Sequence, residues 1–154
     1  SISQQNVHAY VFGEHGDSSF VPWSIANISG IPINQYINCL PEGKRPVVDY
    51  AEIEEYTRKS GAKIIASKGA TFYAIALSVR RICECILRDT DSVMTVSAMI
   101  HNQYGINDVC LSLPFVVGAQ GIRRAVVPPL TKDEEDLLHK SADALKQVIS
   151  QLEI

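Results

Sequence analysis

The residues with the clearest chemical potential are a histidine and its neighbours in the segment 13–18, which reads GEHGDS. This segment follows an apolar run, residues 7–12, which predicts a buried strand. A histidine between two glycines at the end of a strand is expected at an exposed turn. Because imidazole titrates nearer neutral pH than any other unperturbed side chain, His15 can donate or accept a proton there.

The composition predicts an ordinary soluble globular protein. The chain has 154 residues, of which 46% are hydrophobic and 20% charged, with a net charge of -3. We expect one domain over residues 1–154. The basic residues are scattered, which argues against a nucleic-acid partner, and the most apolar stretch, residues 70–79, is too short to span a membrane.

The four cysteines, Cys39, Cys83, Cys85 and Cys110, match no zinc or CxxC spacing. We therefore expect reduced, mostly buried thiols, no metal site, and a cytoplasmic protein. The chain begins at Ser1 without an initiator Met and runs directly into a strand, so we expect it to be the second part of a longer polypeptide.

The first half of the chain predicts strand-like segments followed by helices. Residues 20–28 contain Pro22 and are expected to return beside the first strand as an irregular or edge segment, with Trp23 as a core or interface anchor. Asp49 and Glu52 form a capping-box pattern that begins a helix. Gly69 is expected to interrupt that helix, since an interior glycine costs about 1 kcal/mol relative to Ala.

A second helix is predicted over residues 70–88, and its early half is apolar on almost every side, which is typical of a buried helix. Three strand-like runs follow at residues 92–100, 108–118 and 121–127, and their short connections predict an antiparallel meander. Thr131 and Glu134 form another capping box before a final helix. This order of elements predicts an α+β fold with antiparallel strands packed against long helices.

Four segments together resemble the lactate/malate dehydrogenase family. Residues 7–18 (VHAYVFGEHGDS) are similar to the catalytic segment of L-lactate dehydrogenases, and residues 21–24 (VPWS) continue the similarity. Residues 68–76 (KGATFYAIA) and 108–114 (DVCLSLP), the latter followed by Gly118, are similar to later parts of the same domain. The resemblance covers nearly the whole chain but only the C-terminal, catalytic half of such an enzyme.

The resemblance implies that the full enzyme uses NAD to interconvert pyruvate and L-lactate by hydride transfer, with His15 moving the accompanying proton. In the family an Asp orients this histidine, and an Arg binds the substrate carboxylate through a bidentate contact. Both belong to segments upstream of this chain, as does the NAD-binding Rossmann half, and the chain has no GxGxxG turn of its own. The family does not use the position of Asp17 as the partner of the histidine.

Two helical residues also match family positions. Thr71 matches a residue that lines the substrate pocket, although a helical threonine often bonds back to its own preceding turn. Ile75 lies one turn later and matches a residue beside the nicotinamide, so it is a candidate cofactor contact; without the resemblance it would be a plain core residue.

His8 is a candidate allosteric residue. Bacterial L-lactate dehydrogenases that are activated by fructose 1,6-bisphosphate carry a histidine at this position, seven residues before the catalytic one. The alternative for His8 is a strand histidine that faces solvent. The family also implies a homotetramer.

Two other functions remain open at this stage. Lactate-like malate dehydrogenases tend to have Gly at the position of Glu14 and Thr at that of Ser18, so both residues favour lactate. If the chain were complete by itself, it would carry half a pocket and act as a non-catalytic assembly module. A metal site built from His8, His15 and the cysteines is weaker, because their spacing matches no known ligand set.

Overall fold

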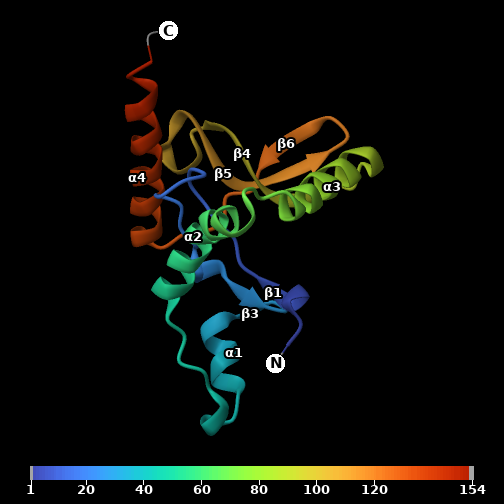
Figure 1. Cartoon of the computed structure of the whole chain (residues 1–154), viewed down its shortest axis with the longest axis vertical. Helices are drawn as coiled ribbons and strands as arrows, with labels where there is room; N and C mark the ends of the chain where they lie inside the picture. Colours follow the sequence, from blue (N-terminus) through green and yellow to red (C-terminus); the bar gives the residue numbers. More distant parts are fainter. Residues whose placement is uncertain (1, 153–154) are drawn as a thin grey trace.

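The structure, a computed structural model, describes residues 2–152 and confirms the α+β architecture (Figure 1). One small sheet contains β1 (Val7–His8), β2 (Asn27–Ile28) and β3 (Ile31–Pro32), and the larger sheet contains β4 (Ser92–His101), β5 (Asn107–Gly118) and β6 (Gly121–Ala125). The α-helices are α1 (Ile33–Cys39), α2 (Tyr50–Lys68), α3 (Tyr73–Arg88) and α4 (Lys132–Ile149). Short 3-10 helices occupy Gln4–Asn6, Trp23–Ile25, Glu42–Lys44 and Gln103–Gly105. Within residues 2–152, no helix combines the length and apolar character needed to cross a bilayer.

The larger sheet is the antiparallel meander that the sequence predicts. It has the order β4-β5-β6, and Val96 of β4 lies opposite Leu113 of β5. Arg123 of β6 also forms ion pairs with Asp89 and Asp91, at 2.7 and 3.0 Å, across the turn between α3 and β4. These ion pairs tie the β5–β6 hairpin to the end of α3.

The hydrophobic core lies between β5 and α4, and it includes the segment around the candidate catalytic turn. Figure 1 shows α4 running along one side of the larger sheet, and both α3 and α4 contact β5. Fully burying one such apolar side chain stabilises a fold by about 1.5–3 kcal/mol. The buried cluster draws on the early segment, β4, β5, the loop between them and α4: Phe12, Phe20, Ile100, Ile106, Val109, Leu111, Leu113, Phe115, Leu138 and Ala142.

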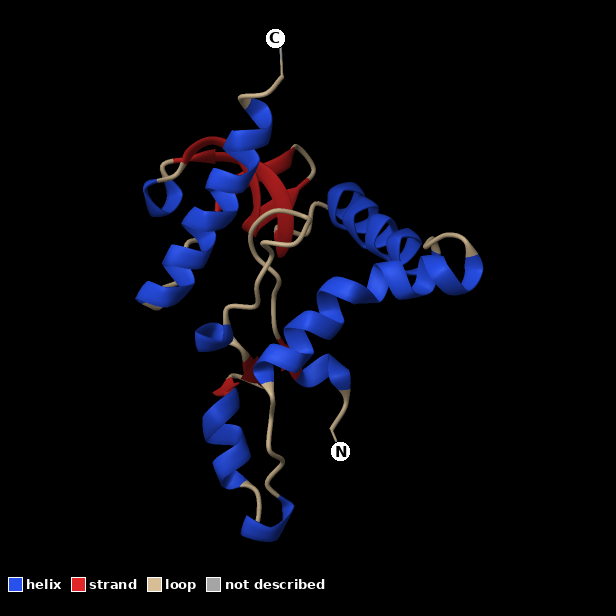
Figure 2. Cartoon of the chain, turned by 60° about the vertical axis from the view of Figure 1, so that its left-hand side comes forward, coloured by secondary structure: helices blue, strands red, loops and turns tan. Residues whose placement is uncertain are grey.

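Both expected ends of α2 are confirmed. Asp49 caps α2 by accepting a hydrogen bond from the Glu52 amide at 3.0 Å. Gly69 ends α2 in the left-handed conformation, with φ of +82°. Figure 2 shows α2 and α3 as a bent pair that extends away from the larger sheet.

The prediction that the early half of the second helix is buried is wrong for the chain as described. Helix α3 begins at Tyr73, three residues later than expected, and Ile75 is 61% exposed. Only Cys85, near the end of α3, is buried. The apolar pattern marks a surface that needs cover, but nothing in residues 2–152 covers it.

Two further burial predictions are also wrong. The segment 7–12 is not a buried strand, because β1 comprises only Val7 and His8, which are both exposed. Its later residue Phe12 is fully buried and pairs with Phe20 through an isolated bridge. Of the four cysteines, which are all free, only Cys85 is buried. The Thr90 hydroxyl donates to Cys85 Sγ and lowers the pKa of that thiol.

The capping box that begins α4 is confirmed, and it also holds a distant segment. Thr131 and Glu134 exchange the two reciprocal bonds of the box. The buried Glu134 carboxylate accepts hydrogen bonds from the Ser24 amide at 2.9 Å and the Ser24 hydroxyl at 2.5 Å. Burial alone would raise the pKa of Glu134, but the bonds from Ser24 and Thr131 outweigh it and lower that pKa.

The substitution Glu134→Gln should destabilise the protein by about 1–3 kcal/mol at pH 7, because an amide replaces a carboxylate that faces only donors. Since the folded-state pKa of Glu134 is lowered, its contribution is complete above the unfolded value of about 4.3 and is lost as the pH falls through the folded value. Urea unfolding of the wild type and of Glu134→Gln should therefore show a difference in the free energy of unfolding that is smaller at pH 3.5 than at pH 7. Glu135→Gln, in the same helical turn, is the matched control; a pH-independent gap would contradict this account.

Candidate catalytic turn and its cavity

The turn that carries His15 is held in place by backbone hydrogen bonds on its strand side. Phe12 and Phe20 exchange two such bonds, of 2.9 and 3.1 Å. Gly13 and Ser112 of β5 exchange two more, of 3.2 and 2.8 Å. The chain therefore enters and leaves the turn at fixed points beside the core.

Inside the turn, Glu14 closes the loop. Its carboxylate accepts hydrogen bonds from the Ser18 amide at 3.2 Å and from the Ser18 hydroxyl at 2.5 Å. A Cβ added at Gly16 would lie 3.1 Å from the same carboxyl group, so the loop is tight at that point. The Glu14 carboxylate therefore stabilises the conformation of the turn.

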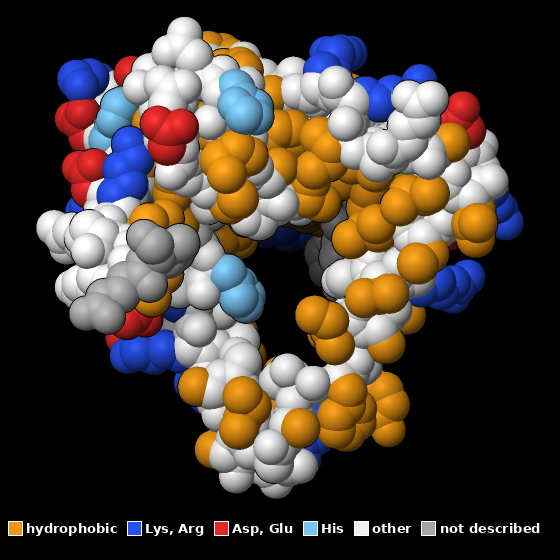
Figure 3. Space-filling view, turned by 90° about the horizontal axis from the view of Figure 1, so that it is seen from above, with side chains coloured by type: hydrophobic (Ala, Val, Ile, Leu, Met, Phe, Trp, Pro, Cys, Tyr) orange, Lys and Arg blue, Asp and Glu red, His pale blue; other side chains and the backbone are white. Residues whose placement is uncertain are grey.

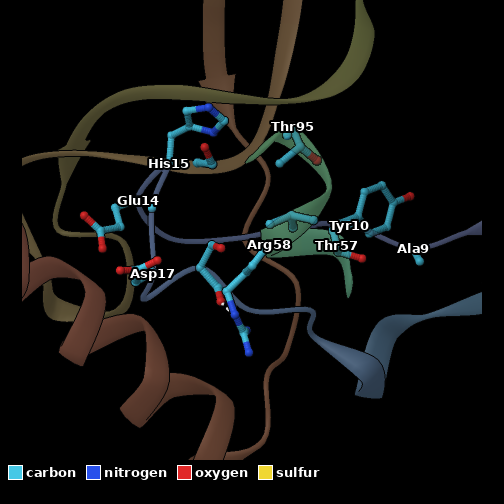
Figure 4. A pocket seen from close by; sticks show the side chains of 13 residues that line it. Ala9, Tyr10, Glu14, His15, Asp17, Thr57, Arg58 and Thr95 are labelled. Atoms are coloured by element: carbon cyan, nitrogen blue, oxygen red, sulfur yellow. Dashed lines mark hydrogen bonds between the residues drawn. The ribbon is translucent and has the colours of Figure 1, made fainter. Parts of the chain in front are cut away.

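His15 is exposed, as predicted, and its ring borders an open cavity (Figure 4). No hydrogen bond found among residues 2–152 involves the His15 imidazole; those of the turn use Glu14 and Ser18 instead. Figure 4 shows the Asp17 carboxylate well apart from the His15 ring. The nearest acidic residues in sequence therefore leave the imidazole free for another partner.

The cavity beside His15 has a volume of about 560 Å³, within the usual range for small-molecule sites. The segment 9–19, helix α2 and strands β4 and β5 together enclose it. Helix α2 contributes Thr57, Arg58 and Gly61, and the sheet contributes Thr95 and Ser112. The site is thus assembled from four separate parts of the sequence.

Polar contacts hold α2 beside the turn, because no residue of α2 is buried. Arg58 Nη1 donates to the Ser19 carbonyl at 3.0 Å and lies 3.4 Å from the Glu54 carboxylate. Trp23 Nε1 donates to Glu54 Oε1 at 2.6 Å, and the Trp23 ring packs on Tyr50 with centroids 4.5 Å apart. Trp23 is half-buried and anchors the early segment to α2.

The sequence analysis missed Arg58 and Thr95 as cavity residues. On a helix, Arg58 reads as half of an ordinary solvated ion pair with Glu54, four residues earlier. Thr95 reads as a strand residue chosen for its β-branched shape. In the structure, Thr95 Oγ1 is buried without a hydrogen-bond partner among the described residues. No sequence signal marks either residue.

The structure does not bring the other candidates into this cavity. Thr71 is exposed in the connection before α3, so it neither lies in a buried turn nor bonds back within a helix. Ile75 is exposed on α3, and His8 is exposed on β1. None of the three lines the cavity around His15, and their proposed roles stay predictions.

The lining residues limit what the cavity can hold. Within residues 2–152, no three His, Cys, Asp or Glu side chains gather closely enough to hold a metal ion. A dinucleotide carries two phosphates, which proteins commonly bind at a glycine-rich turn that begins a helix. The lining offers no such turn, and its one guanidinium, Arg58, is already bound to Ser19 and Glu54. The described lining therefore provides neither a phosphate-binding turn nor an uncommitted guanidinium for a dinucleotide.

Replacing Gly13 with Ala should destabilise the protein by about 2–4 kcal/mol. Gly13 has φ of +94°, and a Cβ there would lie 2.6 Å from Ser141 Oγ, so backbone strain and overpacking combine. Gly30→Ala is the matched control, because Gly30 has φ of +84° but no atom near its added Cβ. We expect Gly30→Ala to cost only about 1 kcal/mol, from strain alone. Equal losses in urea unfolding would show that the turn and α4 are not tightly packed.

Comparison with known proteins places this geometry in context. Residues 1–153 match the model of the lactate/malate dehydrogenase α/β C-terminal domain. The L-lactate dehydrogenase of Acetivibrio thermocellus is 43% identical over 99% of this chain and 48% of the relative, and that of Thermoanaerobacterium saccharolyticum is 46% identical over 100% and 49%. The chain therefore spans about half the length of the curated relatives it matches.

Solved structures give the same result. An L-lactate dehydrogenase from Clostridium thermocellum superposes with a TM-score of 0.85 at 37% identity, covering 99% of this chain and 49% of that chain. A minor L-lactate dehydrogenase from Enterococcus mundtii superposes with a TM-score of 0.88 at 30% identity, covering 99% and 48%. This chain belongs to the lactate/malate dehydrogenase family and forms its α/β C-terminal domain.

Proposed function

We propose that this chain is the substrate-side half of an NAD-dependent L-lactate dehydrogenase, in which His15 carries the proton. The observation that supports this most is an imidazole without a hydrogen-bond partner among residues 2–152, at the edge of a small-molecule cavity and on a turn whose backbone is fixed by β5. The relatives named above are L-lactate dehydrogenases, which favours lactate over malate and a catalytic role over an assembly module.

In this proposal, the bound cofactor would supply the redox chemistry, NADH as hydride donor to C2 of pyruvate and NAD+ as hydride acceptor from C2 of lactate. His15 must be protonated for pyruvate reduction, so that its N–H donates to the carbonyl oxygen as that oxygen gains charge. In lactate oxidation, the neutral imidazole takes the hydroxyl proton. Since the imidazole has no partner among the described residues, we propose that a carboxylate from an NAD-binding half orients it.

The substrate carboxylate also needs a partner from outside this chain. A bidentate guanidinium contact suits a carboxylate. Arg58, the one arginine of the cavity lining, already donates to Ser19 and faces Glu54. We therefore propose that an arginine of the NAD-binding half binds the carboxylate, and that Arg58 shapes the cavity wall.

The exposed apolar side chains of α3 and the connection before it support such a second half. Figure 3 shows hydrophobic side chains gathered around a central opening of the molecule. Phe72, Tyr73, Ile75 and Leu77 are between 46% and 73% exposed, the Phe72 and Tyr73 rings lie against each other, and large exposed apolar side chains gathered on one segment mark an interaction site. We propose that the NAD-binding half covers it, so that Thr71 reaches the substrate and Ile75 the nicotinamide. A homotetramer and a cytoplasmic location remain part of the proposal.

The proposal can be tested by joining this chain to the part of the Acetivibrio thermocellus enzyme that it does not match. The joined protein should oxidise NADH with pyruvate, and the 154 residues alone should not. His15→Asn should lower kcat at least about 100-fold, since general acid catalysis contributes about 10²–10⁴, while NADH binding followed by fluorescence stays within twofold. His139→Asn, an exposed histidine of α4, is the control. Turnover by the 154 residues alone, or near-normal turnover by His15→Asn, would refute the proposal.

We also propose that His8 helps to bind fructose 1,6-bisphosphate as an activator. His8 is exposed on β1 and outside the cavity, so a phosphate can reach it without entering the reaction site. A charged hydrogen bond contributes about 1.5–3 kcal/mol, so His8→Ala should raise the half-activating concentration about tenfold or more. His101→Ala, another exposed histidine, is the control. Identical activation curves for wild type and His8→Ala would exclude the effector role.

A further inference from the structure

Helix α4 contacts the catalytic turn through one buried serine. Ser141 is 0% exposed, and its hydroxyl oxygen accepts a hydrogen bond from the Glu14 amide at 2.7 Å. These two residues are 127 positions apart in the chain. Figure 4 shows α4 beside the turn, on the side where Glu14 and Asp17 lie. The bonded amide belongs to the residue directly before His15.

The contact is part of a closed network of hydrogen bonds. Ser18 Oγ lies 3.0 Å from Ser141 Oγ and 2.5 Å from Glu14 Oε1. A hydroxyl has one proton, and the carboxylate is the stronger acceptor for that of Ser18. The Ser141 proton is then available for the Ser141–Ser18 contact. The two hydroxyls, the Glu14 amide and Glu14 Oε1 all have partners in this network, and a network whose members are bonded to one another is rigid.

Packing at the same point leaves no space for a side chain at Gly13. Gly13 has φ of +94°, and a Cβ there would lie 2.6 Å from Ser141 Oγ and 3.1 Å from Ser141 Cβ. On its other side, Gly13 is bonded through its amide and carbonyl to Ser112 of β5. The backbone at residues 13 and 14 is therefore clamped between β5 and α4.

We propose that Ser141 is a positioning residue for His15, an inference that rests on the proposed function. The His15 imidazole has no hydrogen-bond partner within residues 2–152. The backbone of the turn therefore determines the position of the imidazole without help from a side-chain contact. Without the Ser141 hydroxyl, the Glu14 amide loses its acceptor, and the turn is free to rotate away from α4. Displacements of about 1 Å can lower a rate about 100-fold when they separate reacting groups.

The test uses Ser141→Ala in the joined protein described above. Ala142→Gly is the matched control: Ala142 is the next residue of α4, is buried in the core and has no side-chain polar atom that could bond to the turn, and an interior glycine also weakens a helix. Ser141→Ala should lower kcat for pyruvate at least tenfold with the KM for NADH within twofold. Ala142→Gly should retain kcat within twofold. Equal kcat values for the two variants would overturn the proposal.

Hydrogen–deuterium exchange of residues 13–18 gives a readout that does not need activity. Ser141→Ala should speed amide exchange in this segment at least tenfold relative to Ala142→Gly, whereas a purely structural role would loosen α4 equally in both. Unchanged exchange would overturn the proposal even if kcat falls. If the wild-type joined protein shows no turnover but exchange rises as expected, the contact stands and the proposed function fails.

Discussion

The geometry of this domain depends on one constraint, namely that the carbonyl and the amide of the Gly13–Glu14 peptide group have partners on two different elements. Gly13 pairs with Ser112 of β5, and the Glu14 amide pairs with Ser141 of α4. A buried amide without a partner costs about 1–3 kcal/mol, so strand and helix must both be in place before the turn is stable. The turn that carries His15 therefore forms only together with the core.

The same constraint explains why α4, at the end of the chain, contacts the segment around His15, near its beginning. Phe12 and Phe20, which flank the turn, lie in one buried cluster with Leu111 of β5 and Leu138 of α4. Glu134, at the start of α4, binds Ser24, just beyond the turn. Helix α4 therefore holds the segment around His15 at two points, through the Glu134 carboxylate at its first turn and the Ser141 hydroxyl near its middle.

Local signals in the sequence predict the elements well, because their causes are local. The left-handed Gly69, the capping box of Thr131 and Glu134, and the β-branched runs of the meander all depend on near neighbours. Burial and long-range contacts, in contrast, depend on residues that are far apart in the sequence. An apolar helix such as α3 shows that a face needs cover but not what covers it, and Ser141 looks like any helical serine until β5 and the turn are placed around it. The exposure of His15 could be predicted from the sequence, whereas the hydrogen bond between Ser141 and the Glu14 amide could not.

The charged residues that line the cavity do not bind or orient the His15 imidazole. Glu14 is used within the turn, Asp17 lies away from the imidazole, and Arg58 is paired with Glu54. Among the described residues that line the cavity, each charged group that could bind a substrate carboxylate or orient His15 is therefore already hydrogen-bonded elsewhere or lies apart from the imidazole. If this domain supplies the proton, the groups that make the proton useful must come from outside it. Under the proposed function, this division leaves the imidazole available to a carboxylate of the NAD-binding half, and the rigid turn is what this domain itself contributes.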